Sequence, residues 1–204
     1  MITILVVDDH AIARAGLVSL LETEADLDVI GQAENGSTAI DIVRKSHPQV
    51  IIVDLMMPGM DGVELTKRIR EIDPDAHILI LTTFGDSDDI AHALESGARG
   101  ALMKNTAVPD LLAAIRTVAA GGESIALEIR KMLRLSPPVP QLTYRQMEIL
   151  QSVTRGLTNT DIAHQLGITV DCVKDHVNVI LQKLGAANRS EAVAIALRKH
   201  LLKI

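Results

Sequence analysis

Short apolar runs alternate with longer amphipathic stretches over the first 120 residues of the chain. The apolar runs are four to six residues long and lie at 2–7, 28–33, 50–53, 77–81 and 100–103. Mostly apolar runs of this length are typical of strands that are covered on both faces. Helical patterns fall between and after them, at 10–24, 36–46, 61–71, 87–96 and 107–120. This alternation predicts an α/β fold with a doubly wound, five-stranded parallel sheet.

The pattern changes after residue 121. A glycine pair at 121–122 ends the last of these helices, and residues 124–135 predict one more helix. The segment SPPVPQ at 136–141 contains three prolines, which bar a helix and favour an extended spacer. Four helical patterns at 143–154, 158–166, 170–184 and 188–202 then predict a small all-α domain. We therefore expect a first domain over 1–121, a helix and Pro-rich linker over 122–141, and a second domain over 142–204.

Composition narrows the class of protein. Hydrophobic residues make up 48% and charged residues 23% of the 204 positions, as in ordinary globular chains. Aromatic residues make up 1%, which argues against stacking on single-stranded nucleic acid. A single cysteine, Cys172, cannot form an internal disulfide, so a reducing, cytoplasmic location is expected. The sequence shows no signal peptide and no run of about 18 apolar residues, so no membrane association is expected.

The formal charge of −6 is unevenly distributed. Residues 142–204 contain eight Lys or Arg and five Asp or Glu, a net charge of +3, and the rest of the chain carries −9. An acidic first domain joined to a basic second domain suggests different partners for the two domains.

Polar residues coincide with the ends of four predicted strands. Asp8 and Asp9 follow the first strand, Asp54 follows the third, Thr82 ends the fourth and Lys104 follows the fifth. Any one of them could be a turn former or a helix cap. Because the carboxyl ends of parallel strands meet at one edge of a sheet, three carboxylates there would repel one another unless a cation were bound.

The chemistry of such a site follows from its parts. Carboxylate oxygens suit Mg²⁺, and a carboxylate can attack phosphorus to give an aspartyl phosphate. Phosphoryl transfer needs mainly positioning and charge neutralisation, which a divalent metal and an ammonium group supply. We interpret Asp54 as the phosphate acceptor, Asp8 and Asp9 as metal ligands, Lys104 as the counter-ion and Thr82 as the hydroxyl that senses the phosphoryl group.

The segments LVVDDH, IIVDLMMPGMDG, ILTT and GARGALMK, in this order, resemble the receiver domain of bacterial two-component response regulators. The resemblance implies a flavodoxin-like sheet with strand order 2-1-3-4-5 and phosphorylation of Asp54 by a sensor histidine kinase. It also implies Mg²⁺ bound by Asp9, Asp54 and the Met56 carbonyl oxygen, with Asp8 acting through water. Self-phosphorylation and autodephosphorylation at Asp54 are then the only reactions expected, and the chain is not expected to be an enzyme for other substrates.

One position departs from the family pattern. Receivers usually carry Tyr or Phe three residues before the lysine, and this chain has Ala101 there. A methyl group cannot act as the aromatic switch, so either Thr82 alone drives the change or the signal is read differently. The alternative is a receiver that works without phosphate and signals through protein contact or a bound ligand. Haloacid-dehalogenase-like phosphatases are disfavoured, because they typically need a second Asp where this chain has Met56.

The segment NTDIAHQLGITVDCVKDHV at 159–177 has the spacing of a helix-turn-helix. Ala163 would lie where two helices cross closely, and Gly167 suits the left-handed end of the first helix. Thr169 can cap the second helix, and Val173 would face inward. An ordinary αα-corner needs the same residues, so this spacing alone leaves DNA binding open.

The segments LTYRQMEIL, GLTNTDIAHQLGI and CVKDHVNVILQKLGAANRSEAV resemble the LuxR-type DNA-binding domain, with the helix-turn-helix at about 157–176. The whole chain then resembles a NarL/FixJ-type transcriptional regulator. The resemblance implies that the helix at 170–184 enters the major groove of double-stranded DNA. The expected contact residues are Lys174, Asp175, His176 and Asn178 on that helix, and Thr158, Thr169 and Lys183 as phosphate contacts. For each of them, a merely solvated helix face is the alternative.

Two positions of the second domain also depart from the family pattern. Gln146 stands where the family usually has an acid, and Asp175 stands in the groove-facing row, which often holds a small residue. A carboxylate there costs DNA affinity unless it accepts a hydrogen bond from cytosine. The last helix carries an apolar face that resembles the family's dimer seam, although part of it must pack on its own domain. That face consists of Val193, Ala196 and Leu197.

Together these features predict a response regulator that binds DNA as a homodimer when active, with RNA polymerase as a further candidate partner. Phosphorylation of Asp54 would shift the chain from a form with a masked basic domain to one that dimerises on a two-fold operator.

Overall fold

The computed structural model of the chain describes residues 1–83, 87–135, 142–198 and 201. The chain divides into two compact units, Met1–Pro138 and Val139–Ile204. The predicted Pro-rich segment at 136–141 lies outside the described residues, and so do residues 199, 200 and 202 of the last predicted helix.

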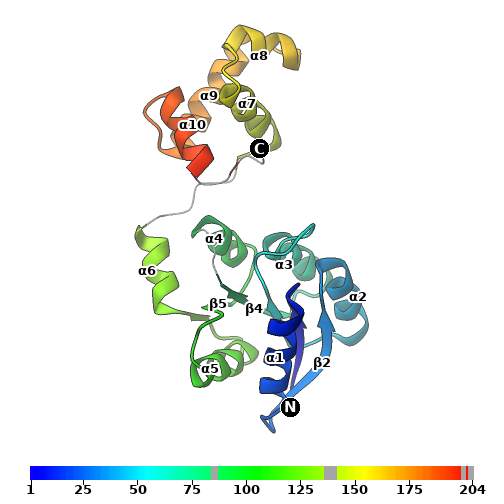
Figure 1. The fold of residues 1–204 in the computed structure, drawn as a ribbon. Helices are drawn as coiled ribbons and strands as arrows, with labels where there is room; N and C mark the ends of the chain where they lie inside the picture. The colour runs from blue at the N-terminus through cyan, green and yellow to red at the C-terminus, as the bar shows by residue number, and fades with distance from the viewer. Residues whose placement is uncertain (84–86, 136–141, 199–200, 202–204) are drawn as a thin grey trace. The chain divides into compact units, whose positions relative to one another are not determined.

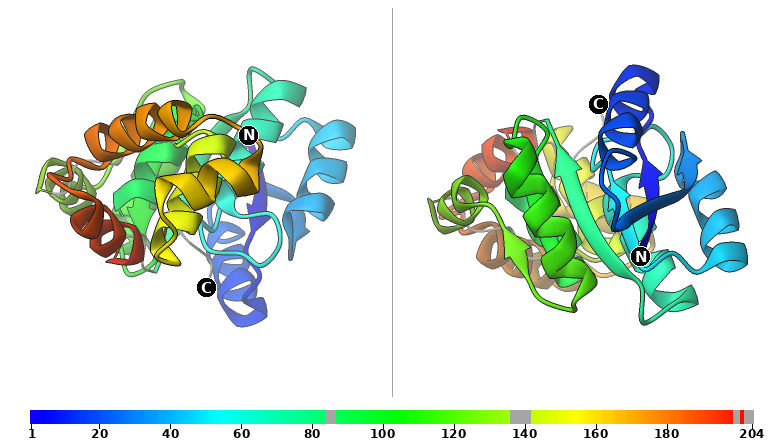
Figure 2. Two further views of the ribbon diagram at one scale, coloured as in Figure 1. Left: turned by 90° about the horizontal axis from the view of Figure 1, so that it is seen from above. Right: turned by 90° about the horizontal axis from the view of Figure 1, so that it is seen from below.

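The first unit is a parallel sheet with helices on both faces (Figures 1 and 2). Its strands are β1 Ile2–Val7, β2 Leu27–Ala33, β3 Val50–Val53, β4 His77–Thr82, β5 Gly100–Met103 and β6 Ser124–Ile125. Its helices are α1 Ala11–Leu21, α2 Gly36–Ser46, α3 Gly62–Ile72, α4 Ser87–Glu95, α5 Val108–Ala119 and α6 Leu127–Leu135. The strand order is β2-β1-β3-β4-β5-β6, and all neighbours are parallel. The predicted order 2-1-3-4-5 is therefore confirmed for the first five strands.

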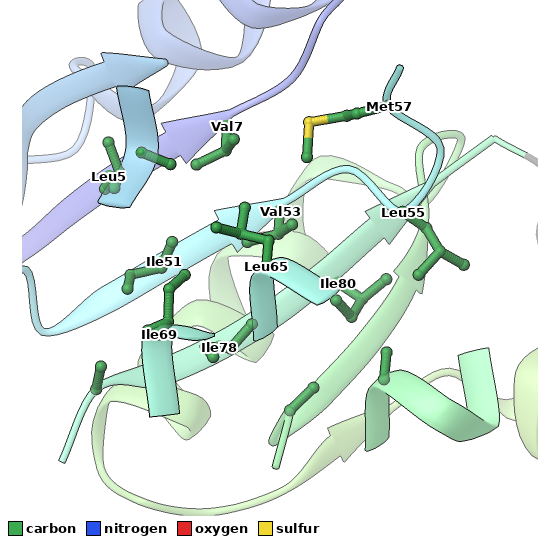
Figure 3. Packing of buried hydrophobic residues seen from close by; sticks show 14 of the residues in the cluster. Leu5, Val7, Ile51, Val53, Leu55, Met57, Leu65, Ile69, Ile78 and Ile80 are labelled. Carbon is green, nitrogen blue, oxygen red and sulfur yellow. The ribbon is translucent and has the colours of Figure 1, made fainter. Parts of the chain in front are cut away.

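The strands bury side chains on both faces, as their apolar runs predict. In β1, Leu5 and Val7 belong to one core, whereas Ile4 and Val6 belong to another. The first core contains residues of α2, α3, α4 and α6, and Figure 3 shows part of it. The second core contains residues of α1 and α5. Because side chains alternate along a strand with a period of two, one apolar run serves both layers.

The structure departs from the sequence prediction between residues 121 and 135. Ser124 and Ile125 extend the sheet as a sixth strand, with Ile125 opposite Ala101 of β5. A two-residue strand offers no periodicity for a sequence pattern to detect. The helix predicted as part of the linker is α6, and its Ile129 is fully buried in the first core. The first compact unit therefore extends beyond the predicted domain boundary at residue 121.

The second unit contains, within its described residues, the helices α7 Tyr144–Thr154, α8 Asn159–Leu166, α9 Val170–Leu184 and α10 Arg189–Arg198. Thr143 and Thr158 begin α7 and α8 with capping boxes, which satisfy backbone N–H groups of the first turn. Gly167 ends α8 in the left-handed conformation, with a φ of 64°, as the sequence predicts. Aliphatic residues of all four helices form one core. None of the described helices is long and apolar enough to span a membrane.

We predict that Ile129→Ala destabilises the first unit by about 2–5 kcal/mol, because it deletes a fully buried side chain from the core. Leu135→Ala on the same helix is the matched control, since Leu135 is 87% exposed. Urea denaturation of the full chain, followed by circular dichroism, measures both effects. Equal, small losses of stability in the two variants would show that α6 does not support the sheet unit.

A second stability prediction concerns His77, the first residue of β4. Its Nδ1 atom is buried and has no hydrogen-bond partner among the described residues. Burial, assisted by the positive charge of Arg99, lowers the pKa of His77 below its ordinary value of 6.5. The folded chain therefore binds this proton less readily than the unfolded chain. The contribution of neutral His77 to stability is complete above pH 6.5 and is lost as the pH falls through the lower, folded-state pKa.

We therefore expect the free energy of unfolding of the wild type to fall between pH 7 and pH 5 more steeply than that of His77→Gln. Urea titrations at several pH values in this range measure the two slopes. Parallel slopes would contradict the assignment of this pH dependence to His77.

Candidate functional site

The register of the parallel sheet brings the carboxyl ends of β1 and β3 together. Val7 lies opposite Val53, and the Asp54 N–H donates to the Val7 carbonyl oxygen at 2.8 Å. Asp8 and Asp54 therefore leave the sheet from paired positions. Beyond β3, the Lys104 N–H donates to the carbonyl oxygen of Thr82 at 2.7 Å. Residues from four strand ends thus meet at one edge of the sheet.

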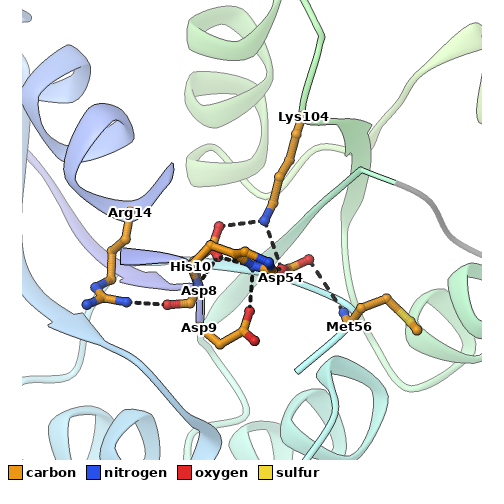
Figure 4. Close-up of polar contacts among 7 residues, drawn as sticks. All are labelled: Asp8, Asp9, His10, Arg14, Asp54, Met56 and Lys104. Carbon is orange, nitrogen blue, oxygen red and sulfur yellow. Dashed lines mark hydrogen bonds and ion pairs between the residues drawn. The ribbon is translucent and has the colours of Figure 1, made fainter. Parts of the chain in front are cut away.

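A lysine bridge is the strongest electrostatic feature of this edge (Figure 4). Lys104 Nζ lies 2.8 Å from Asp54 Oδ2 and 2.6 Å from Asp8 Oδ2. Both carboxylates are buried, and the Lys104 side chain is 14% exposed. Burial alone lowers the pKa of Lys104, but its hydrogen bonds to Asp54 and Asp8 and the charges of both outweigh burial and raise the pKa above its ordinary value. The ammonium group therefore stays charged between the two acids.

The loop after β3 is fixed by close backbone packing against α3. The Gly62 N–H donates to the Leu55 carbonyl oxygen at 2.9 Å, and a Cβ on Gly62 would lie 2.7 Å from the Asp54 carbonyl oxygen. Any larger residue would force the start of α3 away from Asp54. The Met56 N–H lies 3.4 Å from Asp54 Oδ1, and the Met56 side chain points outward with 55% exposure. The backbone of this loop, more than its side chains, therefore shapes the surroundings of Asp54.

The acidic residues of this edge fit a divalent cation. Ligand atoms of Asp8, Asp9, His10 and Asp54 all lie within 4.8 Å of one another. Three carboxylates beside one ammonium group leave a formal charge of −2 when the histidine is neutral. Such hard oxygen donors are the ligands that Mg²⁺ takes in proteins. The predicted metal residues Asp8, Asp9 and Asp54 are thus brought together.

Two residues of this edge were missed by the sequence reasoning. His10 precedes the first turn of α1, and its Nδ1 lies 2.8 Å from Asp9 Oδ1. Arg14, one turn later, donates from Nη1 to the Asp8 carbonyl oxygen at 2.5 Å. Their four-residue spacing, which sets Arg14 one turn after the N-cap residue His10, is the signal that could have revealed them.

Thr82, the last residue of β4, and Ala101, within β5, lie on adjacent strands. Both are fully buried, and Ala101 belongs to the first core. The β4–β5 register sets Thr82 opposite Met103, next to Lys104. Ala101 contributes only a methyl group, so this position lacks the aromatic ring that the family usually carries.

The helix α9 presents three of the predicted DNA-contacting residues to solvent. Lys174, Asp175 and Asn178 are exposed, and His176 is partly buried. Lys174 Nζ pairs with Asp171 Oδ1 at 2.9 Å, an exposed contact of small energetic value. Val173 on the opposite side is fully buried, and so is most of Ala163, as the helix-turn-helix spacing predicts.

The side chains predicted to contact DNA phosphates form hydrogen bonds within the second unit. Thr158 Oγ1 lies 2.5 Å from Asp161 Oδ2, and hydrogen bonds from Thr158 lower the pKa of Asp161. Thr169 Oγ1 accepts the Cys172 N–H at 3.2 Å and so begins α9. Lys183 Nζ donates to Gln146 Oε1 at 3.0 Å, where the family's usual acid would make an ion pair.

The predicted dimer face of α10 requires one correction. Ala196 is fully buried in the core of the second unit, so it cannot contact another chain while α10 stays packed. Val193 is partly buried against the same core. Leu197 is 44% exposed and is the one of the three that offers an apolar surface.

Comparisons with known proteins agree with both halves of this description. Residues 4–116 match the response regulator receiver domain, and residues 140–196 match the bacterial regulatory proteins of the luxR family. The transcriptional regulatory protein LiaR of Bacillus subtilis is 38% identical over 210 residues, which cover 99% of this chain and 100% of that protein. The response regulator protein VraR of Staphylococcus aureus is 34% identical over 207 residues and 99% of each chain.

Solved structures give the same result. The response regulator ChrA of a heme-sensing two-component system is 35% identical, with a TM-score of 0.59 and 98% of each chain covered. The response regulator RcsB, solved in complex with DNA, is 25% identical, with a TM-score of 0.67 over 96% of this chain and 98% of that chain. The chain therefore belongs to the two-component response regulators that join a receiver domain to a LuxR-type DNA-binding domain, and it is a regulator of transcription.

Proposed function

We propose that Asp54 accepts a phosphoryl group from a sensor histidine kinase and that this phosphorylation controls binding of α9 to double-stranded DNA. One observation carries the proposal: Lys104 Nζ bridges the buried carboxylates of Asp8 and Asp54 at the carboxyl edge of the sheet. A buried carboxylate that is positioned beside a fixed cation is suited to nucleophilic attack on phosphorus.

The chain's own residues account for the positioning of the reaction. Lys104 holds Oδ2 of Asp54, which leaves Oδ1, near the Met56 N–H, as the attacking oxygen. An Oδ1–P bond would form while the bond between phosphorus and the kinase histidine nitrogen breaks, and that nitrogen would keep the electron pair. Lys104 would then share its charge with the new phosphoryl oxygens.

Mg²⁺ would be held by Asp9, Asp54 and the Met56 carbonyl oxygen and through Asp8, and it would supply further neutralisation of the phosphoryl charge. The observed cluster of these three acids supports this assignment. The proposed reactions at Asp54 are self-phosphorylation and autodephosphorylation, with no turnover of other substrates.

We propose that Thr82 transmits the structural change caused by phosphorylation of Asp54. Its hydroxyl would bond a phosphoryl oxygen, and its backbone is already tied to Lys104 by a 2.7 Å hydrogen bond. A displacement of the backbone of either residue would therefore move the other. Ala101 favours a second candidate, a regulator that signals through protein contact without phosphate, because it lacks the usual ring.

The DNA-binding half of the proposal uses the exposed face of α9. Lys174 can reach guanine or a phosphate, Asn178 can pair with adenine, and Asp175 can accept from cytosine. A homodimer would place two copies of α9 on a two-fold site. RNA polymerase is the further proposed partner of the DNA-bound form.

We predict that acetyl phosphate with Mg²⁺ raises the affinity of the wild type for a selected DNA fragment by about 5–150-fold, the usual range of coupling between sites. Asp54→Asn cannot form the aspartyl phosphate, so the same treatment should leave its affinity unchanged. Fluorescence anisotropy at one fixed salt concentration measures both proteins, because DNA affinity depends on salt. An Asp54→Asn protein that responds like the wild type would exclude phosphorylation as the switch.

A further prediction tests whether α9 recognises specific DNA bases. Asn178→Ala should reduce discrimination between the selected fragment and a scrambled one by about 5–150-fold, the value of one bidentate base contact of 1–3 kcal/mol. Gln151→Ala, at an exposed position of α7, is the control. Equal discrimination by the Asn178→Ala and control proteins would show that Asn178 does not recognise a base.

A further inference from the structure

His10 places a nitrogen atom among the carboxylates of the receiver site. It directly follows Asp9 and precedes the first turn of α1. Its Nδ1 lies 2.8 Å from Asp9 Oδ1, 3.5 Å from Asp8 Oδ1 and 3.9 Å from Asp54 Oδ2 (Figure 4).

These distances are compatible with ligands that share one ion. A small divalent ion in octahedral coordination binds its ligands at 2.0–2.1 Å, so two ligands of the same ion lie at most about 4.2 Å apart. All three distances from Nδ1 fall below this limit.

The contact between His10 and Asp9 is short but is not a hydrogen bond. Asp9 Oδ1 is buried and has no hydrogen-bond partner among the described residues, although Nδ1 lies 2.8 Å away. The two atoms therefore lie side by side without an aligned proton between them. Two ligand atoms of one ion have this relation, because their lone pairs point to the ion and not to each other.

Of the three oxygen atoms near Nδ1, Lys104 binds one, Asp54 Oδ2. Its ammonium group binds Oδ2 of Asp8 and Oδ2 of Asp54, whereas the short contacts of Nδ1 are to Oδ1 of Asp9 and Oδ1 of Asp8. The His10 side chain is 68% exposed, so an ion can reach it from solvent.

We propose that His10 is an additional metal ligand and that the site therefore binds first-row transition ions, with Co²⁺ as the probe, in preference to Mg²⁺. Imidazole nitrogen favours such ions, whereas carboxylate oxygen alone suits Mg²⁺. This inference rests on the proposed function, because it uses the same three acids.

Isothermal titration of the full-length wild type, His10→Ala and His10→Asn with Co²⁺ and with Mg²⁺ tests the proposal. Loss of the nitrogen ligand should weaken Co²⁺ binding by about tenfold or more, the scale on which ligand-shell changes act, and should leave Mg²⁺ binding nearly unchanged. The visible absorption of bound Co²⁺ should also shift in both variants. His47→Ala is the control, since His47 is 65% exposed and pairs with Asp73, away from this site.

The outcomes separate this inference from the proposed function. If a wild type that binds Mg²⁺ shows the same ratio of Co²⁺ to Mg²⁺ affinity as the two His10 variants, only the role of His10 is overturned. Tighter binding of both ions by the variants would also overturn it, because His10 would then merely occupy the place of the ion. A folded wild type that binds neither ion would overturn the metal site of the proposed function as well. Thermal melting followed by circular dichroism confirms that each variant is folded.

Discussion

The ammonium group of Lys104, held between the buried carboxylates of Asp8 and Asp54, is the interaction on which the receiver unit depends. The positive charge of Lys104 offsets the repulsion between these two carboxylates at the edge of an aliphatic sheet. Removal of one partner of a buried pair typically costs about 3–5 kcal/mol, because the remaining charge is left uncompensated. Parallel register makes the pair possible, since β1, β3 and β5 all deliver their carboxyl ends to one edge. The close approach of Gly62 to the Asp54 backbone then fixes the loop that follows Asp54.

Much of this site could be predicted from the sequence. Strand ends in a parallel sheet converge by topology, so Asp8, Asp54 and Lys104 are linked as soon as the strands are recognised. The helix-turn-helix could also be predicted. Gly167 suits the left-handed end of α8, and Val173 suits a buried position on α9. In both cases, recognising the helices and strands along the sequence is enough to predict which residues lie close together.

Features that depend on packing could not be predicted in the same way. The two-residue strand β6 is too short to show a period, and the burial of Ile129 depends on the sheet being there first. Ala196 has the same apolar character whether it faces a second chain or its own core, and only the fold shows that it is buried. His10 and Arg14 have a spacing that fits the start of a helix, but only the fold shows that both contact the acids that follow β1.

For the proposed switch, the fully buried Ala101 supplies no aromatic ring, and the backbone hydrogen bond between Lys104 and Thr82 would offer one route for a signal from Asp54. In the proposed function, Asp54 is the phosphate acceptor of a metal-dependent site. Labelling by acetyl phosphate, with the modified residue located by mass spectrometry, tests it most directly. We expect one phosphoryl group per chain, on Asp54, that disappears when Mg²⁺ is chelated and in Asp54→Asn. Labelling at another residue, labelling that does not need a divalent ion, or a folded chain that takes no label would contradict it.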